Sequence, residues 1–334
     1  MINIISTCAN KNKVSGPGKV FQNLQKGLEK IKYPYVINRD INATTRLWIH
    51  DHVEALKYLP YSKAHTIIGP NLFVLPSDIP IDIKIPKNIL YLHPCEWPID
   101  FFKTMGFHSC DLHAWPVGID TEQFQPSTLP ANKRKILVYH KQRDSQELAA
   151  IIKILHERDL AYNLVIYGQY TETEYKSILD HTSMILWHGS HESQGIALQE
   201  ALACNIPIMV INATSVLQYA MKEEFPAIVH NIPVTSAPYF DQSCGIIINT
   251  LNDINDALTE ISDNLSTYSP REFVLKNLSL EKQAIEFVKL WERWGMSYEE
   301  GFSEPLKNKE HLHKPTVLRA QNVVSKIKSK LLSK

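Results

Sequence analysis

Short apolar runs alternate along this chain with longer segments in which apolar residues recur at helical spacing. This alternation is typical of parallel sheets whose strands are connected by helices. In the first half, the strands are expected at residues 2–6, 46–50, 65–69 and 89–93. Helices are expected at residues 20–31 and in the segment that follows Asp51.

The second half repeats the same alternation after a proline-containing polar stretch, residues 126–132, which reads as a linker. Strands are expected at residues 135–140, 163–168, 184–187, 208–211 and 244–248, and helices at 145–158, 172–180, 195–203, 254–265 and 280–294. The predicted fold class is therefore α/β, with two Rossmann-like, doubly wound domains facing a cleft and ligands at the carboxyl ends of the strands. The expected domains are residues 1–128 and 129–300, followed by a basic tail, residues 301–334.

Composition narrows the function classes only slightly. A chain of 334 residues with 44% hydrophobic residues is long enough for two cores, and 35 basic residues against 35 acidic ones give no pull toward nucleic acid. The five cysteines are scattered without metal-ligand spacing, which predicts free thiols in a reducing cytoplasm and no metal site. The apolar start is too short for a secretory signal, and no run is long enough to span a bilayer.

Two carboxylates stand out because they flank an expected strand-to-helix turn. Glu192 lies in the loop before the helix, Gly195 lies where the chain turns into it, and Glu200 lies within it. At ~1.5 Å per residue, the helix carries Glu200 roughly 7 Å along its axis from Gly195. Such a site suits a long polar anion: a sugar hydroxyl at Glu192, a phosphate at the helix N-terminus and a ribose diol at Glu200. A solvated helix position is the alternative reading for Glu200.

The surrounding sequence, WHGSHESQGIALQEALACNIP from Trp187, resembles the nucleotide-binding motif of retaining family 4 of the GT-B glycosyltransferases. Gln194 stands where that family usually has Phe, and Asn205 where it usually has Gly. A second segment, residues 93–126, resembles the family's helix start at Glu96, with a helix expected at residues 98–105. Its family-like crossover signature consists of Pro116, Gly118, Asp120, Phe124 and Pro126. The resemblance extends over residues 2–291.

The resemblance implies a metal-independent, retaining hexosyltransferase that uses no cofactor and moves a sugar from a nucleotide-sugar donor to a glycan or lipid-linked glycan, as in polysaccharide biosynthesis. It implies that the donor is bound by Glu200, by the backbone from Ser193 through Gln194 and Gly195 to Ile196, and by glycines of two loops, Gly16, Gly18 and Gly168. The loop of Gly16 and Gly18 also reads as a plain tight turn.

Catalytic residues are expected at Glu192, Lys141, Arg143 and His50. Lys141 and Arg143 follow a strand, where cations can neutralise a departing diphosphate, although a solvated strand end is the alternative. The family's N-domain histidine has no clean counterpart: His50 is the candidate, with His52, His93 and Asn71 as alternatives.

The tail from residue 306 is rich in lysine and has one acidic residue, Glu310, and its apolar residues recur at helical spacing. This pattern predicts a basic amphipathic helix that lies on an anionic membrane; the alternatives are a helix that packs back on the first domain and a disordered tail. A cytoplasmic protein, peripheral at the inner membrane face, is the resulting expectation. A nucleotide-sugar 2-epimerase of GT-B fold and a non-catalytic binding protein are the alternative functions.

Overall fold

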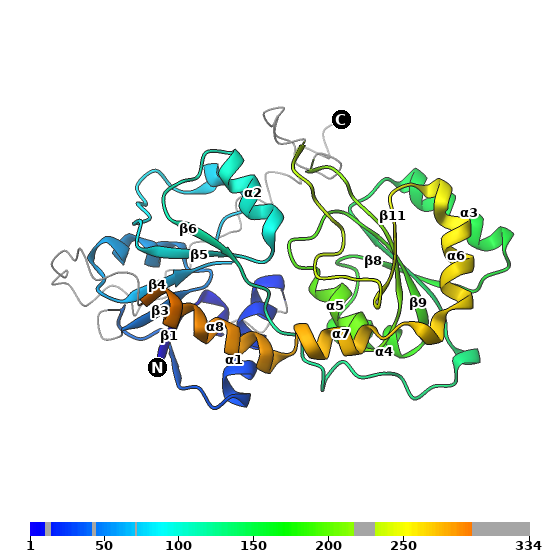
Figure 1. Ribbon diagram of the computed structural model, residues 1–334, viewed down its shortest axis with the longest axis horizontal. Helices are drawn as coiled ribbons and strands as arrows, with labels where there is room; N and C mark the ends of the chain where they lie inside the picture. The colour runs from blue at the N-terminus through cyan, green and yellow to red at the C-terminus, as the bar shows by residue number, and fades with distance from the viewer. Residues whose placement is uncertain (11–14, 42–44, 71, 217–230, 296–334) are drawn as a thin grey trace, which may run out of the picture.

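The computed structural model describes residues 1–10, 15–41, 45–70, 72–216 and 231–295 (Figure 1). Asn71 and the predicted amphipathic tail lie outside these residues. Within the described part of the chain, no helix is both long and apolar enough to cross a membrane.

The first domain is built on a six-stranded parallel sheet of order β2-β1-β3-β4-β5-β6. Its strands are β1 (Ile2–Ile5), β2 (Tyr35–Ile37), β3 (Arg46–Ile49), β4 (His65–Ile68), β5 (Ile89–His93) and β6 (Asp111–Ala114). Helices α1 (Gly16–Lys30) and α8 (Leu280–Gly295) pack on one face of the sheet. The other face is covered by α2 (Glu96–Thr104) and the 3-10 helix η3 (Val53–Tyr61). Further 3-10 turns are η1 (Thr7–Asn10) and η4 (Pro76–Asp78).

The second domain is built on a five-stranded parallel sheet of order β11-β10-β9-β7-β8. Its strands are β7 (Lys135–Lys141), β8 (Tyr162–Ile166), β9 (Thr182–Gly189), β10 (Ile208–Ile211) and β11 (Gly245–Ile248). Helices α3 (Ser145–Glu157) and α6 (Ile254–Asp263) cover one face, and α4 (Glu172–Asp180), α5 (Ile196–Ala203) and α7 (Pro270–Asn277) cover the other. Both predicted doubly wound domains are thereby confirmed.

In each sheet the strand order reverses beside the first strand of the domain. In the first sheet β2 joins one side of β1 and β3 joins the other, and in the second sheet β8 and β9 flank β7 in the same way. The reversal falls between β1 and β3 in the first sheet and between β7 and β9 in the second. Ligands of such folds bind outside the carboxyl ends of the strands at this switch point. Each domain therefore has one place where side chains from two neighbouring strand ends converge.

The last helix returns to the first domain. Helix α8 lies along α1 (Figure 1), and Phe287 and Trp291 are buried with the apolar residues of β1 and β3. The range 129–300 expected for the second domain therefore includes a helix whose core contacts lie in the first.

The chain passes between the domains twice, near Ile119 and near Ser279, and these two crossings lie side by side. Ile119 donates its backbone N–H to Leu278 O at 2.7 Å and forms an isolated parallel bridge with Ser279. Gly118 is needed here because a Cβ atom on it would lie 2.6 Å from Leu280 Cα. The expected glycine at a domain seam is therefore explained by close backbone approach.

Some elements differ from the sequence-based expectation. The segment after Asp51 is a 3-10 helix that contains Pro60, and α2 begins at Glu96 rather than at residue 98. Strands β2 and β6 and helix α7 were not expected. Both strands are at sheet edges. β2 is only three residues long and half-buried, and β6 alternates exposed with half-buried residues, so neither presents the longer apolar run by which buried strands are recognised.

Candidate active site

The switch point of the second sheet brings Glu192 together with Lys141, one of the predicted cations, and Glu200 follows in the helix after the same loop. Lys141 ends β7 and pairs in register with Gly189, which ends β9. Glu192 follows β9 in the loop, and Glu200 lies in α5, so both predicted positions are confirmed. Gly195 is the N-cap of α5 with φ +76°, a left-handed conformation that glycine adopts without strain.

Glu192 is a buried carboxylate with a lysine partner in its own domain. Lys141 Nζ lies 2.7 Å from Glu192 Oε1 and 2.9 Å from Oε2, and it also lies 4.4 Å from the centre of the Tyr167 ring. Burial raises the pKa of Glu192, and the ammonium group of Lys141 opposes this rise. The pair places one cation and one anion at the carboxyl ends of β7 and β9.

Glu200 is also buried, but its lysine partner comes from the other domain. Lys19 in α1 binds Glu200 Oε1 and lies 3.2 Å from Glu172 Oε2 in α4. Burial raises the pKa of Glu200 to about 7, against the opposing effect of Lys19. The carboxylate predicted to bind a ribose is thus one of two in the second domain that α1 contacts through Lys19.

A cavity of about 570 Å³ opens beside this contact, between α1 and α4. Its walls are mostly polar and charged: Lys19, Gln22 and Lys26 come from α1, Glu172 and Lys176 from α4, and Glu200 from α5. A volume of this size accommodates a small polar ligand. The cavity is therefore shared by both domains.

Gln194 connects the loop of Glu192 to the first crossing between the domains. Its amide accepts from Val117 N at 3.0 Å and donates to Val117 O at 2.8 Å, and it is 4% exposed. Its Nε2 also donates to Gln199 Oε1 at 3.0 Å. The residue found in place of the family's usual Phe therefore has its side chain turned to the backbone of the domain seam.

Asn205, the other departure from the family pattern, has φ +58° and so occupies the left-handed conformation that a glycine would adopt. Asparagine tolerates this conformation better than most residues. Its Oδ1 accepts from Arg271 N at 3.2 Å. The local backbone is thus preserved without glycine.

Arg143 lies near the site, but its guanidinium is turned into the protein. It donates to Ile211 O at 3.0 Å and to Glu147 Oε2 at 2.9 Å, and its side chain is 4% exposed. Lys141 is therefore the better placed of the two cations predicted to act on a diphosphate.

The other predicted donor-binding residues fall into two groups. Ser193, Gly195 and Ile196 lie with Glu192 at the start of α5, and Ser193 is exposed. Gly168, with φ +82°, lies in the exposed turn after β8.

The glycines of the first loop lie in the opening turn of α1 rather than before the helix. Gly16 has open space where a Cβ would lie, and Gly18 N donates to the N-cap Ser15 Oγ at 3.1 Å. They begin the helix that carries Lys19.

His50 is fully buried at the end of β3 in the first domain, where its Nδ1 lies 3.1 Å from Ser6 Oγ. It is therefore part neither of the Glu192–Lys141 pair nor of the contact between Glu200 and Lys19. The alternative His93 is also buried, and burial lowers its pKa to about 3.

Two residues that the sequence did not single out connect the second domain to the segment 94–97 of the first. Trp97 Nε1 donates to the backbone oxygen of Glu192 at 2.7 Å, and Tyr239 OH donates to Pro94 O at 2.7 Å. The expected family helix start near Glu96 thus meets the carboxylate loop, as Val117 does through Gln194. The sequence suggested the importance of this segment, but not its contact.

No protein-family model and no curated protein matches this chain by sequence. Solved structures do match. Sucrose-phosphate synthase from Thermosynechococcus elongatus aligns with TM-score 0.51 at 12% identity, over 89% of this chain and 99% of that one. The catalytic domain of starch synthase IV from Arabidopsis thaliana, bound to ADP and acarbose, aligns with TM-score 0.55 at 10% identity, over 88% and 98%. The fold is GT-B.

A third structure with this GT-B fold is HepE from Anabaena in complex with UDP and glucose. It aligns with TM-score 0.51 at 9% identity, over 87% of this chain and 99% of that one. The similarity extends over both domains, since nearly the whole length of each of these proteins is covered. The predicted fold class is thereby confirmed.

Proposed function

We propose that this protein is a glycosyltransferase that binds a nucleotide-sugar donor between its domains, at Glu192 and Glu200. The observation that carries the proposal is the pair of buried carboxylates on either side of the α5 N-terminus, each in contact with a lysine. Burying a carboxylate costs free energy unless it is paired or hydrogen-bonded. A site that buries two of them beside a helix start suits a ligand with hydroxyl groups at both ends and a negative centre.

In the proposed complex, the ribose diol donates to Glu200 and a donor-sugar hydroxyl donates to Glu192. Lys19 contacts only Oε1 of Glu200, and a carboxylate can accept at about four positions, so a diol can bind without expelling the lysine. The diphosphate meets the backbone from Ser193 to Ile196, with Lys141 as its nearest cation. Gly168 lies in the turn nearest to the base in this arrangement.

We propose a retaining reaction. The bond between the anomeric carbon and the donor phosphate oxygen breaks, and the acceptor hydroxyl attacks on the face that the phosphate is leaving. The hydroxyl proton passes to a phosphate oxygen, and Lys141 stabilises the negative charge that develops on the nucleoside diphosphate. Contact between the domains excludes water, which limits hydrolysis of the donor.

The acceptor in this proposal is a glycan or a lipid-linked glycan bound on the first domain, and the transferred group is a hexosyl unit. Support comes from the fold shared with HepE, solved with UDP and glucose, and with starch synthase IV, solved with ADP and acarbose. The first domain contributes Lys19 and Trp97 to the loop and helix that carry the donor carboxylates.

The test is a thermal-shift panel of UDP, GDP, ADP and CMP and their common sugars, without added metal. We expect one nucleotide family to raise the melting temperature of the wild type and to lose this effect in Glu200→Ala. The matched control is Glu260→Ala, which removes an exposed carboxylate from α6 of the same domain. No response to any nucleotide would contradict the proposal and would favour a non-catalytic protein.

Turnover then distinguishes transfer from epimerisation. The donor identified by the panel is incubated with the protein alone and with oligosaccharide acceptors, and the products are followed by proton NMR. Transfer predicts a new glycosidic bond with the anomeric configuration of the donor. Conversion of the donor to its 2-epimer without acceptor would indicate the alternative enzyme.

A further inference from the structure

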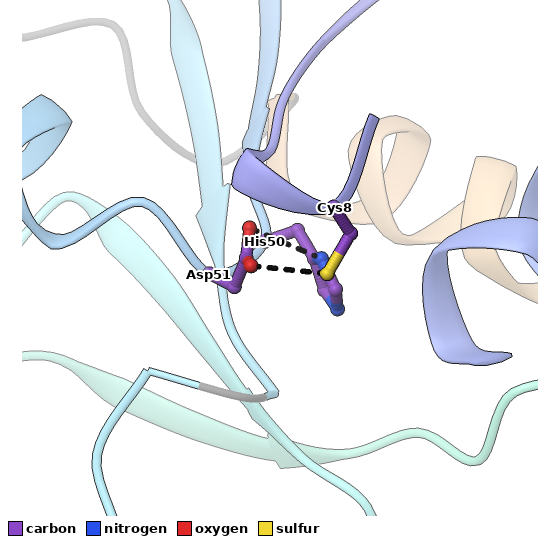
Figure 2. A group of neighbouring side chains, drawn as sticks. All are labelled: Cys8, His50 and Asp51. Carbon is purple, nitrogen blue, oxygen red and sulfur yellow. Dashed lines mark hydrogen bonds and ion pairs between the residues drawn. The ribbon is translucent and has the colours of Figure 1, made fainter. Parts of the chain in front are cut away.

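A cysteine, a histidine and an aspartate meet at the switch point of the first sheet. Cys8 lies in η1 after β1, and His50 and Asp51 follow β3, so the group occupies the strand ends at which the strand order reverses. Their potential ligand atoms all lie within 4.8 Å of one another. In Figure 2 the thiol and the imidazole both turn toward the carboxylate. We propose that Cys8, His50 and Asp51 form a binding site for zinc or a similar divalent transition metal.

The distances suit the coordination of such an ion. Cys8 Sγ lies 3.2 Å from Asp51 Oδ2, and His50 Nδ1 lies 3.5 Å from Asp51 Oδ1. Around a tetrahedral zinc ion with ordinary bond lengths, a sulfur, nitrogen or oxygen ligand lies roughly 3.3 to 3.5 Å from its neighbour. Thiolate, imidazole and carboxylate are also the three ligand types that zinc accepts together. The two spacings end on different oxygens of Asp51, so an ion bound by all three residues takes both carboxylate oxygens or requires a small rotation of the carboxylate; the three ligand types themselves fit zinc.

The carboxylate is already oriented by hydrogen bonds. Asp51 Oδ1 accepts from Ser6 Oγ at 2.8 Å and from Thr7 N at 2.7 Å, and Oδ2 accepts from Thr7 Oγ1 at 2.6 Å. Outer contacts of this kind fix ligand orientation in metal sites. The carboxylate is therefore oriented before an ion arrives.

Metal binding requires a defined proton balance. The Cys8 thiol now donates to Asp51 Oδ2; in the metal complex this proton is released to solvent and the thiolate binds the ion. When the ion binds, the proton on His50 Nδ1, which points to Ser6 Oγ in the metal-free protein, leaves that nitrogen through solvent, and the bound ring carries its proton on Nε2. Three protein ligands leave a fourth position for water or another small ligand, as in zinc sites that are not purely structural.

This site is independent of the proposed donor site, whose carboxylates lie in the second domain. The competing explanation is a metal-free hydrogen-bond network that holds η1 against the end of β3. The two explanations differ in one property. Only a metal site binds an ion through the sulfur of Cys8.

Cobalt is a suitable probe because a thiolate bound to Co²⁺ gives a near-ultraviolet charge-transfer band. Full-length protein treated with a chelator is titrated with Co²⁺, and we expect this band to saturate at one ion per chain and to disappear when Zn²⁺ is added. Cys8→Ser should abolish the band, whereas Cys110→Ser, which changes a free, partly buried cysteine, should keep it. No band in the wild type, or an unchanged band in Cys8→Ser, would overturn the proposal.

A second measurement uses only the wild type, so it does not depend on the folding of a variant. The rate at which iodoacetamide alkylates each cysteine is measured by peptide mass spectrometry, with and without Zn²⁺. We expect Zn²⁺ to slow alkylation of Cys8 at least tenfold and to leave Cys110 unchanged. Equal rates at Cys8 with and without Zn²⁺ would favour the hydrogen-bond network.

Discussion

Lys19 in the first domain binds the carboxylate of Glu200 in the second, and the two residues are 181 positions apart in the chain. The contact places the ammonium group of Lys19 on Glu200, the carboxylate that is predicted to bind the ribose of the donor. In the proposed complex, donor binding and the contact between α1 and α5 therefore depend on the same buried carboxylate.

The first prediction concerns the pH dependence of donor binding. Because the pKa of Glu200 is raised to about 7, the carboxylate is increasingly protonated below that pH and accepts fewer hydrogen bonds from a diol. Affinity for the nucleotide sugar identified by the panel should fall as the pH is lowered from 8 to 6. Calorimetry at each pH measures this affinity. The diester phosphates of the ligand do not titrate in this range, so the change reports on the protein.

Donor affinity plotted against pH should have its midpoint near the pKa of Glu200, and Lys19→Met tests whether Lys19 helps to set that midpoint. The lysine lowers the pKa of Glu200, so its removal should move the midpoint of the affinity curve to higher pH. Lys176→Met is the matched control, because Lys176 lines the same cavity but pairs with Asp180. Equal midpoints in the wild type and Lys19→Met would show that Lys19 does not control this carboxylate.

A second prediction concerns folding stability. The folded pKa of Glu200, about 7, lies above the ordinary value of 4.5, so the folded state binds more protons between these values and stability falls as the pH rises through them. Relative to Glu200→Gln, the wild type should lose up to ~3 kcal/mol of unfolding free energy between pH 4.5 and 7. Urea unfolding of both proteins at a series of pH values measures the difference. A constant difference across this range would contradict the prediction.

The third prediction separates the two cations expected at the diphosphate. Lys141→Ala should lower kcat more than donor affinity, because the ammonium group acts on charge that develops during the reaction. Arg143→Ala should instead lower the melting temperature, since it leaves Glu147 and the carbonyl of Ile211 without this guanidinium. Normal turnover in Lys141→Ala would remove that residue from the mechanism.

A fourth prediction addresses Gln194. Gln194→Ala removes the amide that bonds both backbone groups of Val117, so it should destabilise the protein by about 1–3 kcal/mol. Gln125→Ala, which changes an exposed residue, is the control. The sequence placed Gln194 among the donor-binding residues, and calorimetry tests that role separately. Loss of stability with normal donor affinity would assign Gln194 to the domain seam alone.

The fifth prediction compares two glycines. Gly118→Ala places a methyl group 2.6 Å from Leu280 Cα, and such overpacking should cost about 1–3 kcal/mol. Gly16→Ala meets open space and should change stability by less than about 0.5 kcal/mol. If the backbone of Gly16 approaches the donor, as the sequence predicts, this variant should nevertheless bind the donor more weakly. A stable Gly118→Ala protein would show that α8 can shift.

The sequence was sufficient for relationships that lie within a few turns of chain. Glu192, Gly195 and Glu200 follow one strand and enter one helix, so their arrangement depends on local periodicity and on one glycine in a left-handed conformation. The alternation of strands and helices likewise predicted both sheets. Edge strand β6 was missed because its residues do not form an apolar run.

Relationships between distant segments were not accessible in this way. Nothing near Lys19 in the sequence indicates Glu200, and the strand order that brings Cys8 to Asp51 depends on which side of β1 each later strand joins. Metal-ligand spacing along the chain could not indicate that cluster. The buried orientation of Arg143 was hidden for the same reason, because its carbonyl partners belong to β10 and the loop after it.

The return of α8 to the first domain makes the second domain an insertion within the first, rather than an appendage to it. Both ends of the inserted unit pass through the same seam, where Ile119 pairs with Ser279. A single cut in the chain cannot release a complete first domain, because α8 would leave with the fragment that follows the cut. To test the proposed donor site by exchange with another protein of GT-B fold, one would therefore exchange the segment between the two crossings and keep both ends of the host chain.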